Sequence, residues 1–386
     1  MKKILLLFIS IITVICVLGS SCSKTGFDQV YIELGISVGN HHVYDSSSAN
    51  AVWDMMVYDN KLYVGGGDYN TNLGPVNVHY YDIEKKEWKS SGYVQDEEVS
   101  NFLVIGGLLT LPGIDPKEDW SLGNYYVLKE DKWDKIRTIP GGIHNFDMVE
   151  FDGMLFAGLG VEEGYPIACS KDGGKSFERV MMLKDGESID TDKCADEHRR
   201  VYNLFIQEET LYAQFIYATD VTPISFMINN ELYKYEDEKF IYFDDWSLKS
   251  PITCRAYPKV NFKNKIYFVN KTPDCSKFIY ITDDMKNINK VELPDIDYVY
   301  DLIIKNNVLY VLCSQRQENG THKISVWGNE DGNEAEFKEI LYFEYELPAI
   351  CFEYSEGIFY FGMDSASVYQ KKTKSGMVLS VDYEVN

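Results

Sequence analysis

The sequence is short of positive charge and has no long hydrophobic run beyond its N-terminus. Lysine and arginine total 37 against 60 aspartate and glutamate residues in 386, so the formal net charge is −23. A chain this acidic repels phosphate backbones, and we therefore expect no nucleic-acid partner. No stretch after residue 18 approaches the roughly 20 apolar residues that a membrane-spanning helix needs, so we expect the remainder to fold in water.

Motifs for several common chemistries are also missing. No Cys-x-x-Cys pair occurs, and the six histidines show no His-x-x-x-His spacing, so neither a zinc ribbon nor a catalytic metal is expected. The sequence contains no phosphate-binding glycine loop and no Gly-x-Ser-x-Gly elbow. We therefore expect no metal and no cofactor.

The N-terminus has the order of a secretory signal. A basic start, Met1-Lys2-Lys3, precedes the apolar run Ile4 to Leu18 and the small residues Gly19-Ser20-Ser21. Cys22 follows directly, and this arrangement resembles a bacterial lipoprotein signal, in which the cysteine is diacylated and becomes the first mature residue. The pattern departs from the family at Leu18, which lies four places before the cysteine where three is the norm. An ordinary cleaved signal with an incidental Cys22 is the alternative.

The lipoprotein resemblance implies a location and a division of the chain. Residues 1–21 would be the signal peptide, Cys22 the lipidation site, and residues 22–47 a lipid-anchored tether. The protein would lie in the bacterial cell envelope, in the periplasm or at the cell surface. Six further cysteines follow, and an even set in an exported chain permits disulfides without demanding them, buried free thiols being the alternative. They are Cys169, Cys194, Cys254, Cys275, Cys313 and Cys351.

A unit of about fifty residues recurs along the chain. The segment Trp53 to Val64 matches Phe146 to Ala157 almost position for position, and Tyr300 to Tyr310 repeats it. With Asp54 as the reference, the equivalent positions are Asn101, Asp147, Asn203, Pro258, Asp301 and Ile350. There are thus seven copies, and most contain a hairpin followed by two further strands.

These copies predict an all-β fold, a seven-bladed β-propeller of four-stranded antiparallel blades over residues 48–386. One four-stranded unit cannot bury both of its faces alone, whereas seven units arranged radially cover one another. The ring can close in two ways. The last copy can supply its own fourth strand at about 377–383, or Val30 to Ser37 can act as a latching outer strand. A pair of β-sandwiches is the alternative fold.

Two segments resemble repeats of known propeller families. The run Leu62 to Gly67, followed by Tyr81-Asp82 and Trp88, resembles a kelch repeat. The run Ser170 to Phe177 resembles the Asp-box of sialidases and related propellers. That resemblance implies a structural turn, with Ser170 and Asp172 bonding the turn backbone, Gly174 within it and Phe177 packed beneath.

Sialidase activity is not expected, despite the Asp-box. Sialidases grip the carboxylate of their substrate with three arginines, the first in an Arg-Ile-Pro motif near the start of the domain, and use a tyrosine nucleophile paired with glutamate. This chain has six arginines, none before Arg137, and the region Val30 to Val52 contains no such motif. The catalytic residues of that family are therefore not found here.

The loops that lead into each inner strand, and those joining strands two and three, should share one face around the channel mouth. Asp54, Asp147 and Asp301 should form a partial polar ring there with Asn101 and Asn203. These carboxylates could hold a cation or sugar hydroxyls, or they could tie down neighbouring loops by accepting backbone N–H bonds. Exposed loop aromatics could stack on a sugar or anchor a protein, and they are Tyr69, Trp120 and Tyr165.

We therefore expect an exported, lipid-anchored propeller that binds a glycan or a protein partner without catalysis, and contacts the membrane through the Cys22 lipid. The alternative is a glycoside hydrolase or related carbohydrate-active enzyme on a sialidase-like propeller. A purely structural role in the envelope is the third option.

Overall fold

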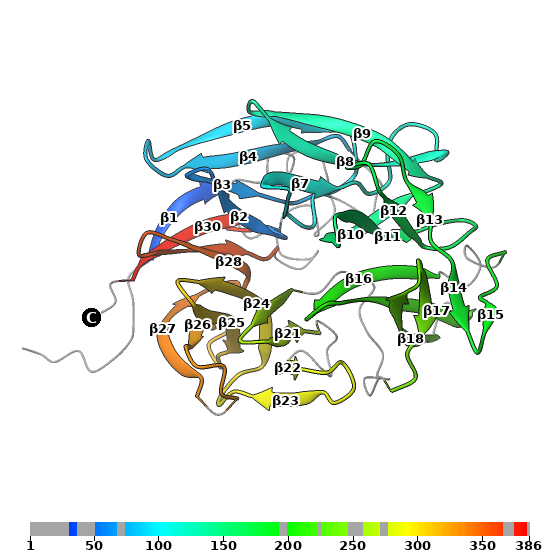
Figure 1. Cartoon of the computed structure of the whole chain (residues 1–386). Coiled ribbons are helices and arrows are strands. Elements are labelled where there is room, and N and C mark those ends of the chain that lie inside the picture. Colours follow the sequence, from blue (N-terminus) through cyan, green and yellow to red (C-terminus); the bar gives the residue numbers. More distant parts are fainter. Residues whose placement is uncertain are drawn as a thin grey trace, which may run out of the picture.

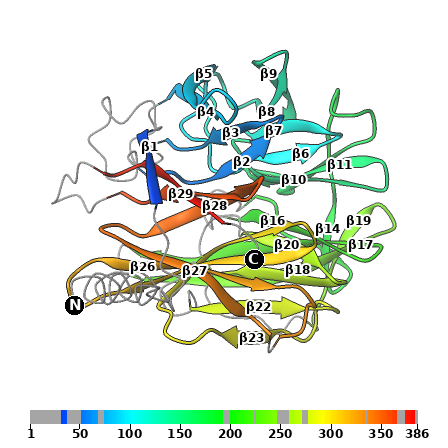
Figure 2. The same cartoon turned by 90° about the vertical axis from the view of Figure 1, so that its left-hand side faces the viewer.

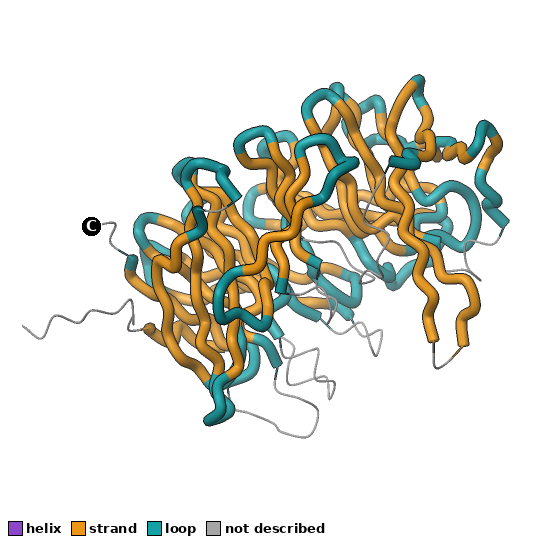
Figure 3. The backbone as a smooth tube through the Cα atoms, turned by 90° about the horizontal axis from the view of Figure 1, so that it is seen from below, coloured by secondary structure: helices purple, strands orange, loops and turns teal. Residues whose placement is uncertain are grey.

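The computed structural model describes residues 31–36, 51–67, 74–192, 199–222, 225–245, 258–270, 277–334, 336–365 and 374–383. Cys22, Tyr69 and the cysteines at 194, 254 and 275 lie outside these ranges. Within them the backbone consists of strands and loops (Figure 3), and none of the described segments is a helix long and apolar enough to cross a membrane.

Five of the sheets are separate four-stranded antiparallel blades. The first comprises β2 (Met55–Tyr58), β3 (Lys61–Val64), β4 (Val76–Asp82) and β5 (Glu87–Val94). The second comprises β6 (Leu103–Ile105), β7 (Leu108–Pro112), β8 (Leu122–Lys129) and β9 (Lys132–Pro140). A third contains β20 (Lys259–Phe262), β21 (Lys265–Val269), β22 (Phe278–Thr282) and β23 (Asn289–Glu292). A fourth contains β24 (Tyr298–Lys305), β25 (Val308–Arg316), β26 (His322–Asn329) and β27 (Lys338–Tyr345).

The fifth separate blade is completed by the N-terminal strand. It has the order β1 (Tyr31–Ile36), β30 (Met377–Asp382), β29 (Ile358–Met363) and β28 (Ala349–Ser355). Of the two ways to close the ring that the sequence left open, the structure has the latching strand. The outer strand of this blade is β1, which pairs with β30 although the two strands lie more than 340 residues apart in the sequence.

The remaining strands form one ten-stranded sheet. One set in it is β10 (His144–Phe151), β11 (Met154–Gly160), β12 (Ile167–Ser170) and β13 (Glu178–Arg179). The other is β16 (Arg200–Gln207), β17 (Thr210–Thr222), β18 (Ser225–Glu236) and β19 (Lys239–Tyr242). The short hairpin β14 (Met182–Lys184) and β15 (Glu187–Ser188) lies beside β19, with β14 parallel to it. The pair Gly160↔Arg200 joins the two sets.

The sheets stand around a common axis, and in the blade that contains β1 the innermost strand is β28 (Figure 1; Figure 2 gives the view from the side). Inner strands of neighbouring sheets contact one another, as β28 does with both β2 and β24. Apolar side chains fill the space between blades. Tyr63 and Val78 of the β2–β5 blade, for example, pack with Leu109 and Tyr126 of the β6–β9 blade. The fold is therefore a β-propeller of four-stranded antiparallel blades.

The turn residues that mark each repeat have the backbone conformation such hairpins need. Asp59 and Asn60 have φ values of 50° and 58°, and Asn306 and Asn307 have values of 51° and 61°. Two consecutive residues with positive φ give a two-residue turn a twist that matches the twist of its strands. Among residues with a side chain, Asn and Asp tolerate this left-handed backbone conformation best. The hairpins predicted from these pairs are confirmed.

Candidate functional site at the channel mouth

A cavity of about 390 Å³ lies on the axis, where the inner strands converge. The lining comes from segments that lead into or form β2, β6, β10, β20, β24 and β28. Its acidic and amide side chains are Asp54, Asn101, Asp147, Asp301 and Glu353. Asn203 instead donates from Nδ2 to Oε1 of Gln214 at 2.8 Å. Most of the predicted polar ring therefore surrounds this one cavity.

Each of the three predicted carboxylates accepts a backbone N–H bond from an adjacent inner strand or from the residue leading into it. Oδ2 of Asp54 accepts from Phe102 at 2.6 Å. Oδ2 of Asp147 accepts from Leu204 at 2.8 Å, and Oδ2 of Asp301 accepts from Phe352 at 3.1 Å. The innermost strand of a blade is an edge strand whose free N–H groups need partners, and these side chains supply them.

Glu353 and two lysines complete the polar lining of the cavity. Oε2 of Glu353 accepts from the backbone N–H of Val57 at 2.8 Å and from Nζ of Lys305 at 3.0 Å. Nζ of Lys259 lies 2.6 Å from Oδ2 of Asp147, whose side chain is 1% exposed. The lining therefore contains four carboxylates and two ammonium groups, and this excess of negative charge suits neutral or cationic ligands better than anions.

A second group of titratable side chains, the rim cluster, gathers at the mouth above this cavity. It comprises Glu97, Asp115, His144 and Arg200. Glu97 precedes β6 and Asp115 follows β7, whereas His144 begins β10 and Arg200 begins β16. The carboxyl groups of Glu97 and Asp115 are hydrogen-bonded, and Nε2 of His144 lies 3.1 Å from Oδ1 of Asp115.

Burial and charge push the two rim carboxyl groups in opposite directions. Burial raises the pKa of Glu97 to about 9, aided by the charges of Asp115 and Glu98. For Asp115 burial also acts to raise the pKa, but the hydrogen bond to His144, the bond from Glu97 and the charge of Arg200 hold it below its usual value. At neutral pH the pair therefore carries one proton, located on Glu97.

Aromatic rings support His144 and Arg200 of the rim cluster. The ring of His144 stacks on Phe146 with the centroids 5.4 Å apart and the planes 6° apart. The guanidinium of Arg200 lies 5.7 Å from the centre of the same ring and donates to the hydroxyl of Tyr202 at 3.2 Å. Phe146 and Tyr202 are themselves buried, at 9% and 2% exposure. The rings of Phe146 and Tyr202 therefore hold the cluster in position. The side chains of His144 and Asp115 are partly accessible, with exposures of 17% and 16%.

Glycines let the segment that carries Glu97 approach the adjacent blade. The N–H of Val99 donates to the carbonyl of Gly66 at 2.8 Å, and Gly67 forms a bridge with Glu98. A Cβ on Gly65 would meet the carbonyl oxygen of Val99, and one on Gly67 would meet that of Glu97. The glycines after β3 are therefore required by this close approach.

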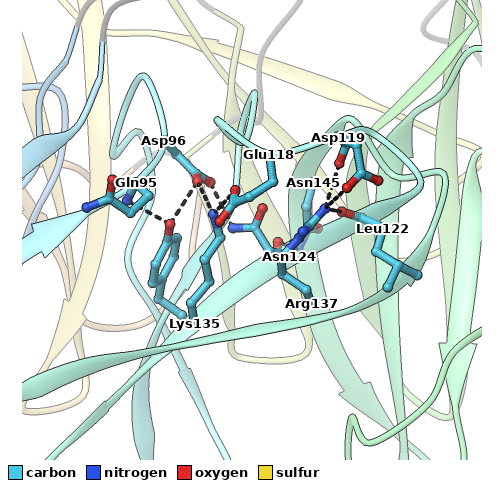
Figure 4. A network of polar contacts seen from close by, with 10 residues as sticks. Gln95, Asp96, Glu118, Asp119, Leu122, Asn124, Lys135, Arg137 and Asn145 are labelled. Atoms are coloured by element: carbon cyan, nitrogen blue, oxygen red, sulfur yellow. Dashed lines mark hydrogen bonds and ion pairs between the residues drawn. The ribbon is translucent and has the colours of Figure 1, made fainter.

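Asp96, next to Glu97, anchors the same segment to the β6–β9 blade through a network of polar contacts (Figure 4). Its carboxylate is fully buried and accepts from the Tyr126 hydroxyl at 2.8 Å and from Nδ2 of Asn124 at 2.9 Å. Nζ of Lys135 lies 3.4 Å from the carboxylate. Burial raises the pKa of Asp96 against the effect of these three partners. The network fixes the loop and so fixes the position of Glu97.

The predicted loop aromatics differ in how they are presented. Trp120 is 45% exposed, and its loop is held by Nη2 of Arg137, which donates to the carbonyls of Asp119 and Leu122 at 2.6 and 3.0 Å (Figure 4). Tyr165 is half-buried against the core between β12 and β17, and its hydroxyl lies 2.6 Å from Oγ of Ser188. Trp120 is therefore the accessible ring of this pair, and Tyr69 lies outside the described residues.

The segment resembling an Asp-box forms the turn between β12 and β13. Oγ of Ser170 accepts from the N–H of Gly174 at 2.8 Å, and Oδ1 of Asp172 accepts from the N–H of Ser176 at 2.9 Å. Phe177 is 4% exposed and meets Tyr125 edge-on. Hydrogen bonds from the side chain and backbone of Ser176 and from Ser170 lower the pKa of Asp172 to about 2. Every contact here serves the turn and its packing.

Three cysteines in the described ranges, Cys169, Cys313 and Cys351, are buried free thiols. Burial raises the pKa of the Cys169 thiol to about 11, which keeps it protonated at neutral pH. Among the residues that the structure describes, no three His, Cys, Asp or Glu side chains are grouped so that they could hold a metal ion.

The sequence alone did not single out Glu97, His144 or Arg200. The repeat contained one indication of their position, because it assigns the segments that carry these three residues to the mouth face. Their convergence depends on the packing of separate blades, which the repeat does not specify.

No protein-family model matches the chain, and no curated protein sequence is similar enough to count as a relative. Solved structures with a similar course of the backbone include the β-propeller domain of the Trilobed protease from Pyrococcus furiosus. That match has 11% identity and a TM-score of 0.48, and covers 86% of this chain and 93% of that one.

An α-L-arabinofuranosidase from Fusarium graminearum matches with 11% identity and a TM-score of 0.47, over 79% of this chain and 98% of that one. A putative 6-phosphogluconolactonase from Bacteroides fragilis matches with 11% identity and a TM-score of 0.43, over 79% of this chain and 88% of that one.

Proposed function

We propose that this chain is a non-catalytic binding module whose mouth face binds a glycan. The observation that carries the proposal is Trp120, a large apolar ring 45% exposed on a loop that Arg137 holds in place. An exposed indole on a backbone that is already held in place requires little ordering of its loop when a sugar ring stacks on it, so little of the binding free energy is spent on ordering.

The charge of the axial cavity and of the whole chain supports a neutral ligand. The axial cavity carries more carboxylates than ammonium groups, and the whole chain has a formal net charge of −23. Carboxylates accept hydrogen bonds from sugar hydroxyls, and amides both accept and donate them, whereas an anionic sugar would be repelled. A neutral oligosaccharide is therefore the expected ligand, and a protein partner is the other outcome of the test below.

The test is a glycan-array and thermal-shift screen of residues 23–386. A stabilising oligosaccharide should raise the melting temperature, because a ligand that binds only the folded state stabilises it by mass action. The Trp120→Ala variant should lose this shift. Tyr93→Ala is the matched control, since Tyr93 is an exposed aromatic at 57% on the outer strand β5. A screen without any hit, or a hit that survives in Trp120→Ala, contradicts the proposal.

We further propose that the chain is exported and lipid-anchored through Cys22 and that its ring has seven blades. The order of the N-terminal residues supports the anchor. The seven sequence copies support the count, with the ten-stranded sheet counted as two blades because the pair Gly160↔Arg200 links two four-stranded sets. Mass spectrometry of the mature chain and of Cys22→Ala tests the lipid, and an electron-density map with a different number of blades contradicts the count.

A glycoside hydrolase is the second candidate, and the rim cluster is the observation that favours it. Glu97 keeps a proton at neutral pH while Asp115 beside it is ionised, so this hydrogen-bonded pair can exchange one proton with a bound substrate or water. Glu97 is only 3% exposed, so a substrate would reach Asp115 first. Hydrolysis of a panel of neutral aryl glycosides, abolished in Asp115→Asn, would establish this activity in place of simple binding.

A further inference from the structure

From a feature that three blades share at the start of their inner strands, we infer that Tyr298 is a second sugar-binding position at the channel mouth. It lies on the other side of the axis from Trp120, so the mouth binds an oligosaccharide chain in place of a single sugar. The inference rests on the proposed glycan-binding function. It adds a second contact and the size class of the ligand.

The inner strands β10, β16 and β24 each contain a β-bulge at the same position of the repeat. In each case the residue that the register skips lies directly before the reference residue of its copy, and it is aromatic. These bulged residues are Phe146, Tyr202 and Tyr300. A bulge breaks the regular alternation of a strand and so redirects the side chain of the extra residue. The repeat therefore places one redirected aromatic ring at the mouth end of each of these three strands.

Each of these rings contacts a planar side chain that lies two residues earlier in the same strand. The pairs are His144 with Phe146, Arg200 with Tyr202, and Tyr298 with Tyr300. In the third pair the two rings stack with their centroids 5.7 Å apart and their planes 27° apart. The side chain of Tyr298 is therefore held against a ring that its own strand supplies.

Tyr298 differs from its two counterparts in what is left to bind a ligand. His144 is paired with the carboxylate of Asp115 at 3.1 Å, and Arg200 donates to the hydroxyl of Tyr202. Tyr298 is instead 39% exposed. An exposed ring that is already stacked from one side needs little further ordering when a sugar packs against it.

Two carboxylates lie beside this pair of tyrosines. Burial raises the pKa of Tyr300, and the negative charges of Asp364 and Asp297 raise it further, so both carboxylates are close to its hydroxyl. Oδ2 of Asp297 accepts from the N–H of Arg316 at 2.7 Å, and Oδ1 of Asp364 accepts from the N–H of Ser365 at 2.7 Å. These bonds hold the carboxylates and leave further lone pairs for sugar hydroxyls. An apolar ring edged by hydrogen-bond acceptors matches a sugar, which has an apolar face and a rim of hydroxyls.

Tyr298 and Trp120 lie on the same face but on opposite sides of the axis. Tyr298 begins β24, where the inner strand leaves the mouth, and Trp120 is in the loop before β8, which returns to the mouth. The two strands stand across the axis from each other (Figure 1). A single sugar covers one ring only, whereas a chain of sugars laid over the mouth covers both. Two linked contacts bind more tightly than one, because the second forms within the complex.

The experiment measures the affinity of residues 23–386, which contain every described strand, by isothermal titration calorimetry. The probes are gluco-, manno- and xylooligosaccharides of two and of eight sugar units. The variants are Tyr298→Ala, Tyr298→Phe, which keeps the ring, and Trp120→Ala. Tyr93→Ala is the matched control, because Tyr93 is an exposed tyrosine on the outer strand β5. Urea unfolding of each variant reports separately whether it is folded.

We expect an eight-unit probe to bind wild type more tightly than the two-unit probe of the same sugar. Tyr298→Ala should weaken the eight-unit probe about tenfold and the two-unit probe by about twofold at most, since a short probe still stacks on Trp120. Tyr298→Phe and Tyr93→Ala should bind as wild type does.

Two results overturn the second position and leave the proposed function intact. One is an eight-unit probe that binds folded Tyr298→Ala as tightly as wild type but is lost in Trp120→Ala. The other is equal weakening of the short and the long probe in Tyr298→Ala, which would place both rings at one position. A wild-type chain that binds none of these probes and no glycan on the array overturns the proposed function, and with it the inference.

Discussion

In the Glu97→Gln variant we expect the folded protein to be more stable than wild type at neutral pH and equally stable at pH 4 or below. Glutamine has nearly the shape of a protonated glutamate and can donate to Asp115 from its amide. Unlike Glu97, it has no proton to lose. The difference in unfolding free energy between the two chains therefore isolates the titration of this one side chain.

The sign and size of the effect follow from the pKa of Glu97, which burial raises from 4.5 to about 9. Between these values the folded chain holds a proton that the unfolded chain has released. The stability that this group contributes is therefore complete below pH 4.5 and is lost as the pH rises to about 9. Each pH unit corresponds to about 1.4 kcal/mol, so the penalty at pH 7 is about 3 to 4 kcal/mol at most.

Urea unfolding followed by tryptophan fluorescence at pH 4, 5, 6, 7 and 8 measures this difference. Glu163→Gln is the matched control, because Glu163 is an exposed glutamate in a mouth loop. Its profile should run parallel to that of wild type. If Glu97→Gln also runs parallel to wild type across this range, Glu97 is not the protonated member of a buried pair and the description of the rim cluster is wrong.

Three further outcomes are expected from urea unfolding. Asp147→Ala should lower the free energy of unfolding by about 3 kcal/mol, because it leaves the ammonium of Lys259 without its buried counter-charge. Adding Lys259→Met to the same chain should restore part of this loss. A decrease below about 0.5 kcal/mol in Asp147→Ala would contradict the ion pair between Lys259 and Asp147. Trp88→Phe removes the hydrogen bond from the indole N–H to the carbonyl of Leu34 and should lower the free energy of unfolding by about 1 kcal/mol. Proteolysis before residue 37 should become faster, because β1 is held less firmly. An unchanged cleavage rate counts against this bond as a support of β1. Ser170→Ala removes the acceptor of a buried turn N–H and should cost about 1 to 2 kcal/mol, and full stability in this variant would show that the turn does not depend on it.

Much of the candidate site follows from local patterns. Asp54, Asp147 and Asp301 were placed together because they share one position in the repeat, and they line one cavity. The sequence left open whether they bind a ligand or hold backbone N–H groups, since the same carboxylates suit both. The observed bonds to Phe102, Leu204 and Phe352 show them holding adjacent strands.

The rim cluster could not be found in this way. Glu97 and His144 lie four and three residues before the reference positions Asn101 and Asp147, and Asp115 lies inside the second copy, in the loop between β7 and β8, so the three do not share one repeat position. Whether Glu97 keeps its proton depends on how deeply it is buried and on the charges of Asp115, Glu98 and Lys117 around it. Burial and long-range charge are properties of the packed ring, and no short segment carries them.

The sequence by itself determined the repeat, the hairpins and the four-stranded blades, because alternating apolar residues and Asp-Asn, Asn-Asn or Asp-Gly turns act over a few residues. Only the tertiary structure decided which strand closes the ring and which side chains meet at its mouth. The pairing of β1 with β30 joins segments near opposite ends of the chain, and an outer strand pairs with whatever edge the closed ring presents to it.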